Sequence, residues 1–129
     1  LGLPNIDLDW DQLVQAILNL VQNALAALDG QGTLTLRTRT VNNFTIGDTR
    51  HRVIASIEIE DDGPGIPKDM QDSIFYPLVT SRPEGTGLGL PAAQELLSRH
   101  SGLIEFESRP GRTVFFVLIP LDQSEKMNG

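Results

Sequence analysis

The stretch VIASIEIEDDGPG, residues 53–65, is the part of the sequence that decides the fold. From Arg52 to Glu60 apolar and polar residues alternate, which is typical of a half-buried strand with Val53 and Ile59 on its apolar face. The alternation ends at two aspartates, and the glycines and proline that follow favour a loop. We therefore expect a strand that carries carboxylates into a glycine-containing loop.

The sequence before this strand predicts a helix and a partner strand. Residues 33–41 alternate in the same way and, with a long loop over 42–49, predict a hairpin with the strand above. Residues 10–29 predict a long helix, and Asp9 begins a capping-box pattern in front of it. The apolar stripe of this helix consists of Leu13, Ile17, Leu20, Ala24 and Leu28.

The sequence after the glycine loop predicts a second helix and a second hairpin. The expected elements are a short helix over 69–75, an irregular stretch over 77–88, a helix from Leu90 to about His100, and strands over 103–108 and 113–119. This order predicts an α+β protein, a two-layer α/β sandwich whose mixed, mostly antiparallel sheet carries its helices on one face. We expect residues 1–129 to form a single domain, as a fragment of a longer protein, with a disordered tail over 122–129.

The composition of the chain excludes several classes of protein. The chain has 129 residues, enough for one domain, and its net charge of -7 opposes binding to a nucleic-acid backbone. It has no cysteine, which excludes a disulfide scaffold and a thiol nucleophile and fits a reducing compartment. No apolar run approaches the roughly 18 residues of a membrane span. We therefore expect a cytoplasmic domain without nucleic-acid or membrane contact.

Three local features have a chemical and a plain structural interpretation. Asn19 and Asn23 share a helix face and could offer Mg²⁺ an amide oxygen, or could be two solvated amides. Asp61 at a strand end could accept a hydrogen bond from an exocyclic amine, or could belong to an acidic turn. Residues 85–89, GTGLG, could bind phosphate in front of a helix, or could form a flexible loop. No Lys follows this cluster and position 90 is Leu, so neither a Walker A loop nor a Rossmann motif fits.

Together these features resemble the catalytic ATP-binding domain of bacterial sensor histidine kinases, members of the gyrase–Hsp90–histidine kinase–MutL (GHKL) ATPase superfamily. The matching motifs are NLVQNA (19–24) for the N box, DDGPGI (61–66) for the G1 box, FYPL (75–78) for the F box and GTGLGL (85–90) for the G2 box. Three further stretches, at 36–40, 75–82 and 100–106, are similar to the sensor kinases of nitrogen regulation.

The resemblance implies a GHKL (Bergerat) fold with a site for ATP and Mg²⁺. Asp61 would receive the adenine amine, Asn23 would bind the Mg²⁺, and residues 66–84 would form a lid over the nucleotide. The candidate catalytic residues are Asn19, Asn23 and Arg82. The candidate nucleotide-binding residues are Asn19, Asn23, Ala27, Asp61, Gly63, Gly65, Ile66, Thr80, Ser81, Arg82, Gly85, Thr86, Gly87, Leu88, Gly89 and Leu90.

Three positions depart from the family pattern. Hydrolytic relatives carry Glu where Asn19 stands, and an amide cannot abstract a proton from water, so transfer to another nucleophile is favoured over hydrolysis. Ala26 occupies a position where many histidine kinases have Lys or Arg, and Arg82 is our candidate replacement. Leu78 stands where many F boxes end in Phe, which is expected to loosen the packing of the lid.

The resemblance also implies partners. The accepting histidine of the family lies in a separate helical dimerisation domain, and neither His51 nor His100 is placed like it. We expect a protein histidine kinase domain that acts with its own dimerisation and phosphoacceptor domain, an NtrC-like response regulator and the PII signal protein. The fragment would be a monomer and the whole protein a homodimer. The alternatives are a non-catalytic module for nucleotide sensing and partner docking, and a GHKL-type ATP hydrolase.

Overall fold

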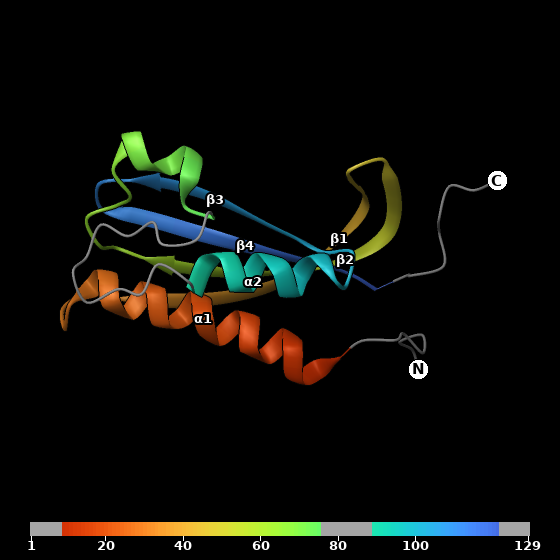
Figure 1. The fold of residues 1–129 in the computed structure, drawn as a ribbon, viewed down its shortest axis with the longest axis horizontal. Helices are drawn as coiled ribbons and strands as arrows, with labels where there is room; N and C mark the ends of the chain where they lie inside the picture. Colours follow the sequence, from red (N-terminus) through yellow and green to blue (C-terminus); the bar gives the residue numbers. More distant parts are fainter. Residues whose placement is uncertain (1–8, 76–88, 122–129) are drawn as a thin grey trace.

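The computed structural model describes residues 9–75 and 89–121, and it has the two layers that the sequence predicts. In chain order the elements are α1 (Trp10–Leu28), β1 (Leu34–Ile46), β2 (Thr49–Asp61), the short 3₁₀ helix η1 (Lys68–Ser73), α2 (Gly89–Ser98), β3 (Leu103–Arg109) and β4 (Arg112–Pro120). The strands lie in the order β1-β2-β4-β3, and α1 and α2 lie side by side on one face of the sheet (Figure 1). The α+β fold class is thus confirmed, and every pairing among the described strands is antiparallel.

The first hairpin differs from the prediction. We expected a long loop over 42–49, but β1 and β2 pair as far as Ile46 and Thr49, so that only a tight turn separates them. Gly47 supplies φ 63° at the first position of this turn, where a backbone without a Cβ is favoured. Asn43, at φ 56°, interrupts the ladder without shifting its register. The Asn and Gly residues therefore mark a local irregularity and a turn inside a long ribbon.

Both ends of α1 lie close to where the sequence predicts, but of the predicted capping box only the bond to the Asp9 side chain is seen, and the Asp9 N–H donates to His100. The Asp9 side chain accepts a hydrogen bond from the backbone N–H of Gln12 at 3.2 Å, which caps the first turn. Asp29 adopts the left-handed conformation at the other end, and its N–H donates to the Leu25 carbonyl. The helix is therefore positioned by its own termini as well as by packing.

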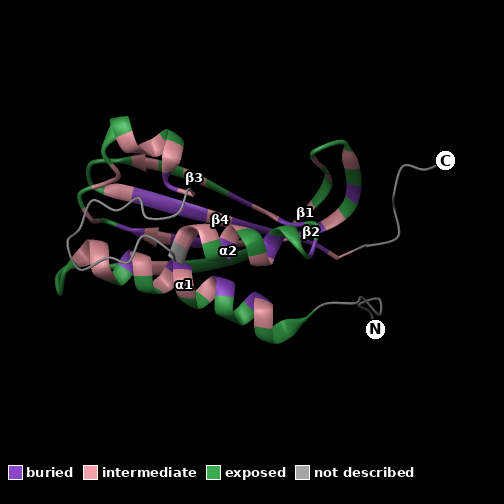
Figure 2. Ribbon diagram, in the orientation of Figure 1, coloured by how far each residue is buried: buried purple, intermediate pink, exposed green. Residues whose placement is uncertain are grey.

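The core lies between the helices and the sheet. Its buried side chains come from α1, α2, β2, β3 and β4, together with Ile74 just after η1, and β4 is buried along most of its length (Figure 2). Phe106 stacks on Phe115 with ring centroids 5.7 Å apart, and Phe75 meets Phe106 edge-on at 6.2 Å. The core members are Leu13, Ala16, Leu20, Ala24, Ile59, Ile74, Ala93, Leu97, Ile104, Phe115, Val117 and Ile119.

His100 links the end of α2 to the start of α1 through hydrogen bonds. It is 7% exposed, its Nδ1 lies 2.8 Å from the Leu96 carbonyl oxygen, and its Nε2 accepts a hydrogen bond from the Asp9 N–H at 3.1 Å. Because the carbonyl can only accept, this geometry places the ring proton on Nδ1. Both nitrogens are thus engaged inside the domain, which gives His100 a structural role.

A charged network fastens the sheet on the face opposite the helices. Arg37 of β1 contacts Glu58 at 3.0 Å and Glu60 at 2.6 Å, and Arg112 of β4 reaches Glu60 at 3.3 Å. The hydrogen bond from Arg37 lowers the pKa of Glu60, although partial burial opposes this effect, and the same pairing raises the pKa of Arg37. Glu60 directly precedes Asp61, so three strands are tied together just before the candidate site.

Candidate functional site

The site is built around the carboxylate at the end of β2. Asp61 is 2% exposed and lies in register with Thr113 of β4. The backbone N–H of Gly63 donates to Asp61 Oδ1 at 2.9 Å, which fixes the orientation of the carboxylate. A buried carboxylate is strongly destabilising unless it is hydrogen-bonded, so this group is held by the loop that follows it.

Gly63 lies where the loop passes closest to α1. A Cβ at this position would be 2.9 Å from Asp61 Oδ1 and 3.1 Å from the Ala27 carbonyl oxygen. A side chain would therefore press on the carboxylate and on the last turn of α1 together. Glycine is therefore required here because the loop packs tightly against Asp61 and the end of α1.

Gly65 presses the loop against the β3–β4 hairpin. Its φ is 89°, and a Cβ there would lie 2.6 Å from the Arg109 carbonyl oxygen. The Gly111 N–H also donates to the Gly63 carbonyl at 2.9 Å. The second hairpin therefore supports the glycine loop, and the two glycines are required for different contacts.

Two hydroxyl groups that the sequence analysis did not single out anchor the end of the loop. Ser108 Oγ accepts a hydrogen bond from the Ile66 N–H at 2.8 Å and lies 2.7 Å from Thr113 Oγ1. Thr113 is 4% exposed and is the ladder partner of Asp61. No local sequence signal marks this pair, because its importance depends on the pairing of β4 with β2.

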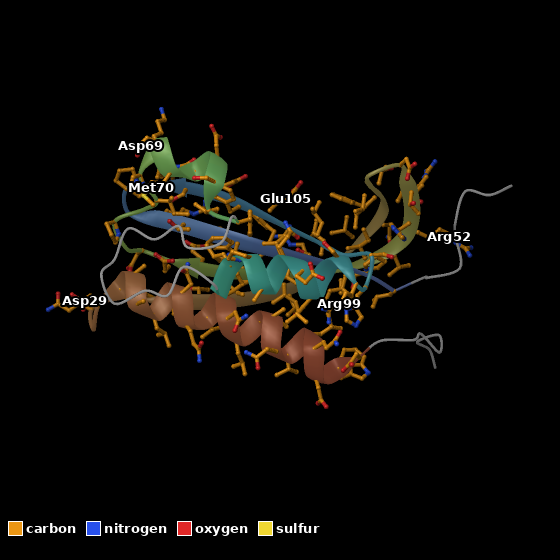
Figure 3. All side chains as sticks on the ribbon, viewed as in Figure 1. Asp29, Arg52, Asp69, Met70, Arg99 and Glu105 are labelled. Carbon is orange, nitrogen blue, oxygen red and sulfur yellow. The ribbon has the colours of Figure 1, made fainter. Side chains whose placement is uncertain are left out.

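The candidate amides lie in the middle and the second half of α1, and the last turn of this helix lies against the glycine loop at Gly63. Asn19 and Asn23 are both half-buried, and Asn19 Oδ1 accepts a hydrogen bond from Gln15 Nε2 at 2.8 Å. Asp29 at the end of α1 and Met70 in η1 lie at the same end of the molecule, opposite Arg52 and Arg99 (Figure 3). The last turns of α1 and the glycine loop thus share one end of the domain.

The candidate lid, residues 66–84, is described only over residues 66–75. Phe75 of the F box packs on the core through Phe106, and Leu90 at the start of α2 also packs against the core. Residues 76–88 lie outside the described residues. This range holds several predicted site residues, namely Thr80, Ser81, Arg82, Gly85, Thr86, Gly87 and Leu88, and Gly89 follows it as the first residue of α2. The predicted tail over 122–129 also lies outside the described residues.

The described residues offer no metal cage of their own. Within 9–75 and 89–121, no three His, Cys, Asp or Glu side chains gather so that they could hold a metal ion. Asn23 offers one hard oxygen ligand, and a Mg²⁺ held there would take its other oxygens from water and from a bound phosphate group. None of the described helices is long and apolar enough to cross a membrane.

Comparison with known proteins agrees with this geometry. Residues 8–123 match the family of histidine kinase-, DNA gyrase B- and HSP90-like ATPases. The chain belongs to this family. It is 51% identical over 121 residues to the sensory histidine kinase/phosphatase NtrB of Klebsiella oxytoca and 44% identical over 122 residues to NtrB of Rhodobacter capsulatus. The catalytic domain of the histidine kinase ThkA matches the fold with a TM-score of 0.73 and 28% identity, covering 90% of this chain and 70% of that one.

These similarities confirm the family that the motifs predict. The matches to NtrB cover 93% and 91% of this chain but 35% and 34% of the relatives, so the chain spans about a third of the length of these curated relatives. It is an NtrB-like histidine kinase ATPase domain with the α+β GHKL fold, and its family is one that uses ATP.

Proposed function

We propose that this histidine kinase domain binds ATP with Mg²⁺ between α1, the glycine loop and α2, and delivers the γ-phosphoryl group to a histidine on a separate phosphoacceptor domain. The observation that carries the proposal is the buried Asp61 carboxylate at the end of β2, whose orientation is fixed by the Gly63 N–H. A carboxylate accepts hydrogen bonds only, so it selects a base that presents an amine. Adenine does so, and guanine presents an oxygen at the same place.

Each part of the site has one task in this proposal. Asp61 accepts the adenine amine, while Gly63 and Gly65 let the base lie close to the loop. Asn23 supplies an amide oxygen to Mg²⁺, which would neutralise phosphate charge when bound. The remaining predicted contacts come from Asn19, Ala27, Ile66 and the residues of the lid and the G2 box, including Arg82. The hydrogen bond from the Ile66 N–H to Ser108, which fixes this part of the loop, supports including Ile66.

Asn19 is the reason for proposing that the γ-phosphoryl group is transferred to another group and that ATP is not hydrolysed. Its Oδ1 accepts a hydrogen bond from Gln15, and an amide has no basic group that could activate water. A Glu at this position would be four residues before Asn23 on the same helix face. Catalysis then consists mainly of positioning and of charge neutralisation, and the accepting nucleophile must come from elsewhere.

The partners follow from the similarity to NtrB. We propose that the domain works within a longer homodimeric protein in the cytoplasm, with its own phosphoacceptor domain, an NtrC-like response regulator and the PII signal protein. The absence of cysteine in the chain is consistent with that compartment. A nucleotide-sensing module that docks partners without chemistry is the second candidate, since the site around Asp61 serves binding alone equally well.

Two measurements test the proposal. Calorimetry with ATP should give clear binding that weakens when Mg²⁺ is removed, and Asn23→Ala should lose most of this Mg²⁺ dependence. Gln22→Ala, one residue away on the exposed side of the helix, is the matched control and should bind like the parent. Mixing the domain with the phosphoacceptor domain and ATP should then give phosphohistidine. Free phosphate without phosphohistidine would indicate a hydrolase, and binding without either product would indicate the docking module.

A further inference from the structure

α1 carries a second apolar face that the described part of the domain leaves largely exposed. Trp10, Val14, Leu18 and Leu25 are 62%, 52%, 46% and 52% exposed, although all four are large apolar residues. Val21 lies between Leu18 and Leu25; it is half-buried and also packs against the core, so it forms the inner border of this face. Exposed segments recur along α1 in Figure 2. We call these five residues the α1 seam; contiguous exposed apolar patches on soluble domains are often functional.

The seam faces the β1 side of the domain. α1 packs on β2 and α2 packs on β3, so the strand order β1-β2-β4-β3 puts the free flank of α1 next to the sheet edge at β1. Leu36 lies on the helix-bearing face of β1, opposite Ile59, and is still 55% exposed. At 100° per residue, Asn19 and Asn23 lie on the other flank of the helix. The seam is therefore separate from the nucleotide site.

The spacing of the seam indicates what can cover it. Val14, Leu18, Val21 and Leu25 follow one another at intervals of four, three and four residues. This is the spacing of the d and a positions of a heptad, which packs against another α-helix at a shallow crossing angle. The strip along the polar edge of the seam carries Gln15 and Gln22 and no basic group. A partner helix therefore needs apolar residues at heptad spacing. Acidic residues along its edge would find no basic group to pair with on this strip.

We propose that the α1 seam is the docking surface for an α-helix of the phosphoacceptor domain in the same polypeptide. This inference rests on the proposed function, which requires such a domain. The curated NtrB relatives are about three times as long as the stretch they share with this chain, so they contain chain enough to supply the helix. In such a polypeptide the helix would be tethered to the surface that it covers.

Size and charge favour this tethered helix over a second copy of the chain. The seam exposes on the order of a few hundred Å², whereas a stable interface between free proteins needs about 800 Å² from each partner. A tether raises the effective concentration to the millimolar range, which makes a small surface sufficient. Two copies of this chain would also bring together two domains of charge -7.

The beginning of the seam is held rigid. Asp9 immediately precedes Trp10, and its N–H donates to the buried His100 at 3.1 Å. The first turn of α1 is thus fixed to the end of α2 from inside the domain. A preorganised surface loses less ordering entropy when its partner helix arrives.

Thiol labelling tests the proposal directly, because the chain has no cysteine of its own. Val14→Cys and Leu18→Cys are labelled with a maleimide probe, in the isolated domain and in the intact kinase, and the labelled peptide is quantified. We expect labelling in the intact kinase to be at least tenfold slower at both positions. Asp48→Cys in the exposed hairpin turn should react at the same rate in both proteins. Equal rates at the two seam positions would overturn the proposal.

Two further readouts decide between a tethered helix and a second copy of the chain. Sedimentation of the isolated domain should show a monomer, whereas a dimer that Leu18→Gln dissolves would assign the seam to a second copy and overturn the proposal. Isolated Leu18→Gln should melt and bind ATP like the parent, because the side chain is exposed and lies away from Asn23. If the parent itself fails to bind ATP, the proposed function is wrong, whatever the labelling rates show.

Discussion

Asp61→Asn is the substitution that tests the nucleotide site most sharply. The Gly63 N–H donates to Oδ1 of this residue, so an asparagine has to keep its oxygen toward Gly63, since the reverse orientation would bring two donors together. The new NH₂ group then takes the place of the second carboxylate oxygen. In the proposed complex it faces the adenine amine, which is also a donor.

The magnitude follows from the loss of a charge-assisted hydrogen bond. Such a bond contributes roughly 1.5–3 kcal/mol, so ATP affinity should fall by about 10- to 150-fold. The fold should survive, because Asp61 is 2% exposed and the substitution removes a buried charge without changing the volume of the side chain. A melt without nucleotide should therefore show no loss of stability, while the affinity falls.

Calorimetry with ATP and GTP is the assay, and Asp62→Asn is the matched control. Asp62 is exposed, and its Oδ1 accepts a hydrogen bond from the Thr33 N–H at 2.9 Å, an interaction that an asparagine keeps. The control should bind ATP like the parent, and the parent should bind GTP poorly. The role assigned to Asp61 is refuted if Asp61→Asn binds ATP within twofold of the parent, or if Asp62→Asn is the damaging change.

Three other predictions concern stability and are read from melts or denaturant titrations. Gly65→Ala should introduce left-handed backbone strain of about 1–2 kcal/mol and a clash with the Arg109 carbonyl. It should therefore destabilise the fold more than Gly111→Ala, because Gly111 has nearly the same φ but no atom near the position of the new Cβ. Equal losses of stability in the two variants would contradict the role of the clash. Ser108→Ala leaves a backbone N–H without its acceptor and should reduce stability by about 1–3 kcal/mol, and a loss below about 0.5 kcal/mol would contradict this role. The lowered pKa of Glu60 stabilises the fold above the unfolded pKa of about 4.3, and this contribution disappears as the pH falls through the lower, folded pKa. Glu60→Gln should therefore be less stable at pH 7 and should lose less stability than the parent on acidification.

The helix ends and the glycine loop could be predicted because their causes are local. Asp9 caps α1 through a backbone N–H only three residues away, and Asp29 ends it through its own left-handed conformation. The loop after Asp61 is likewise indicated by its own glycines. Features of this kind depend only on residues close in sequence, so they can be predicted without knowing how the rest of the chain folds.

The parts that the sequence did not predict depend on pairing between distant segments. The 42–49 region looks like a loop because it contains Asn42, Asn43 and Gly47, yet pairing with β2 holds it as strand on both sides of a tight turn. Ser108 and Thr113 look like ordinary hairpin residues until β4 is placed beside β2. Only then does the serine reach the backbone of Ile66.

For α1, too, the sequence alone does not decide which residues are buried. The helix has apolar residues on two adjoining stripes, and helical periodicity supports the burial of either one. The sequence points to the stripe that contains Leu13 and Leu20, and the structure does bury these residues, but only the position of β1 at the sheet edge shows that Val14 and Leu18 remain exposed. The helix therefore has three distinct faces: one packs in the core, one carries the candidate Mg²⁺ ligand, and one carries the exposed α1 seam. Because a straight helix moves as one body, a helix that docks on the seam would set the position of the nucleotide site relative to the accepting histidine without touching the nucleotide.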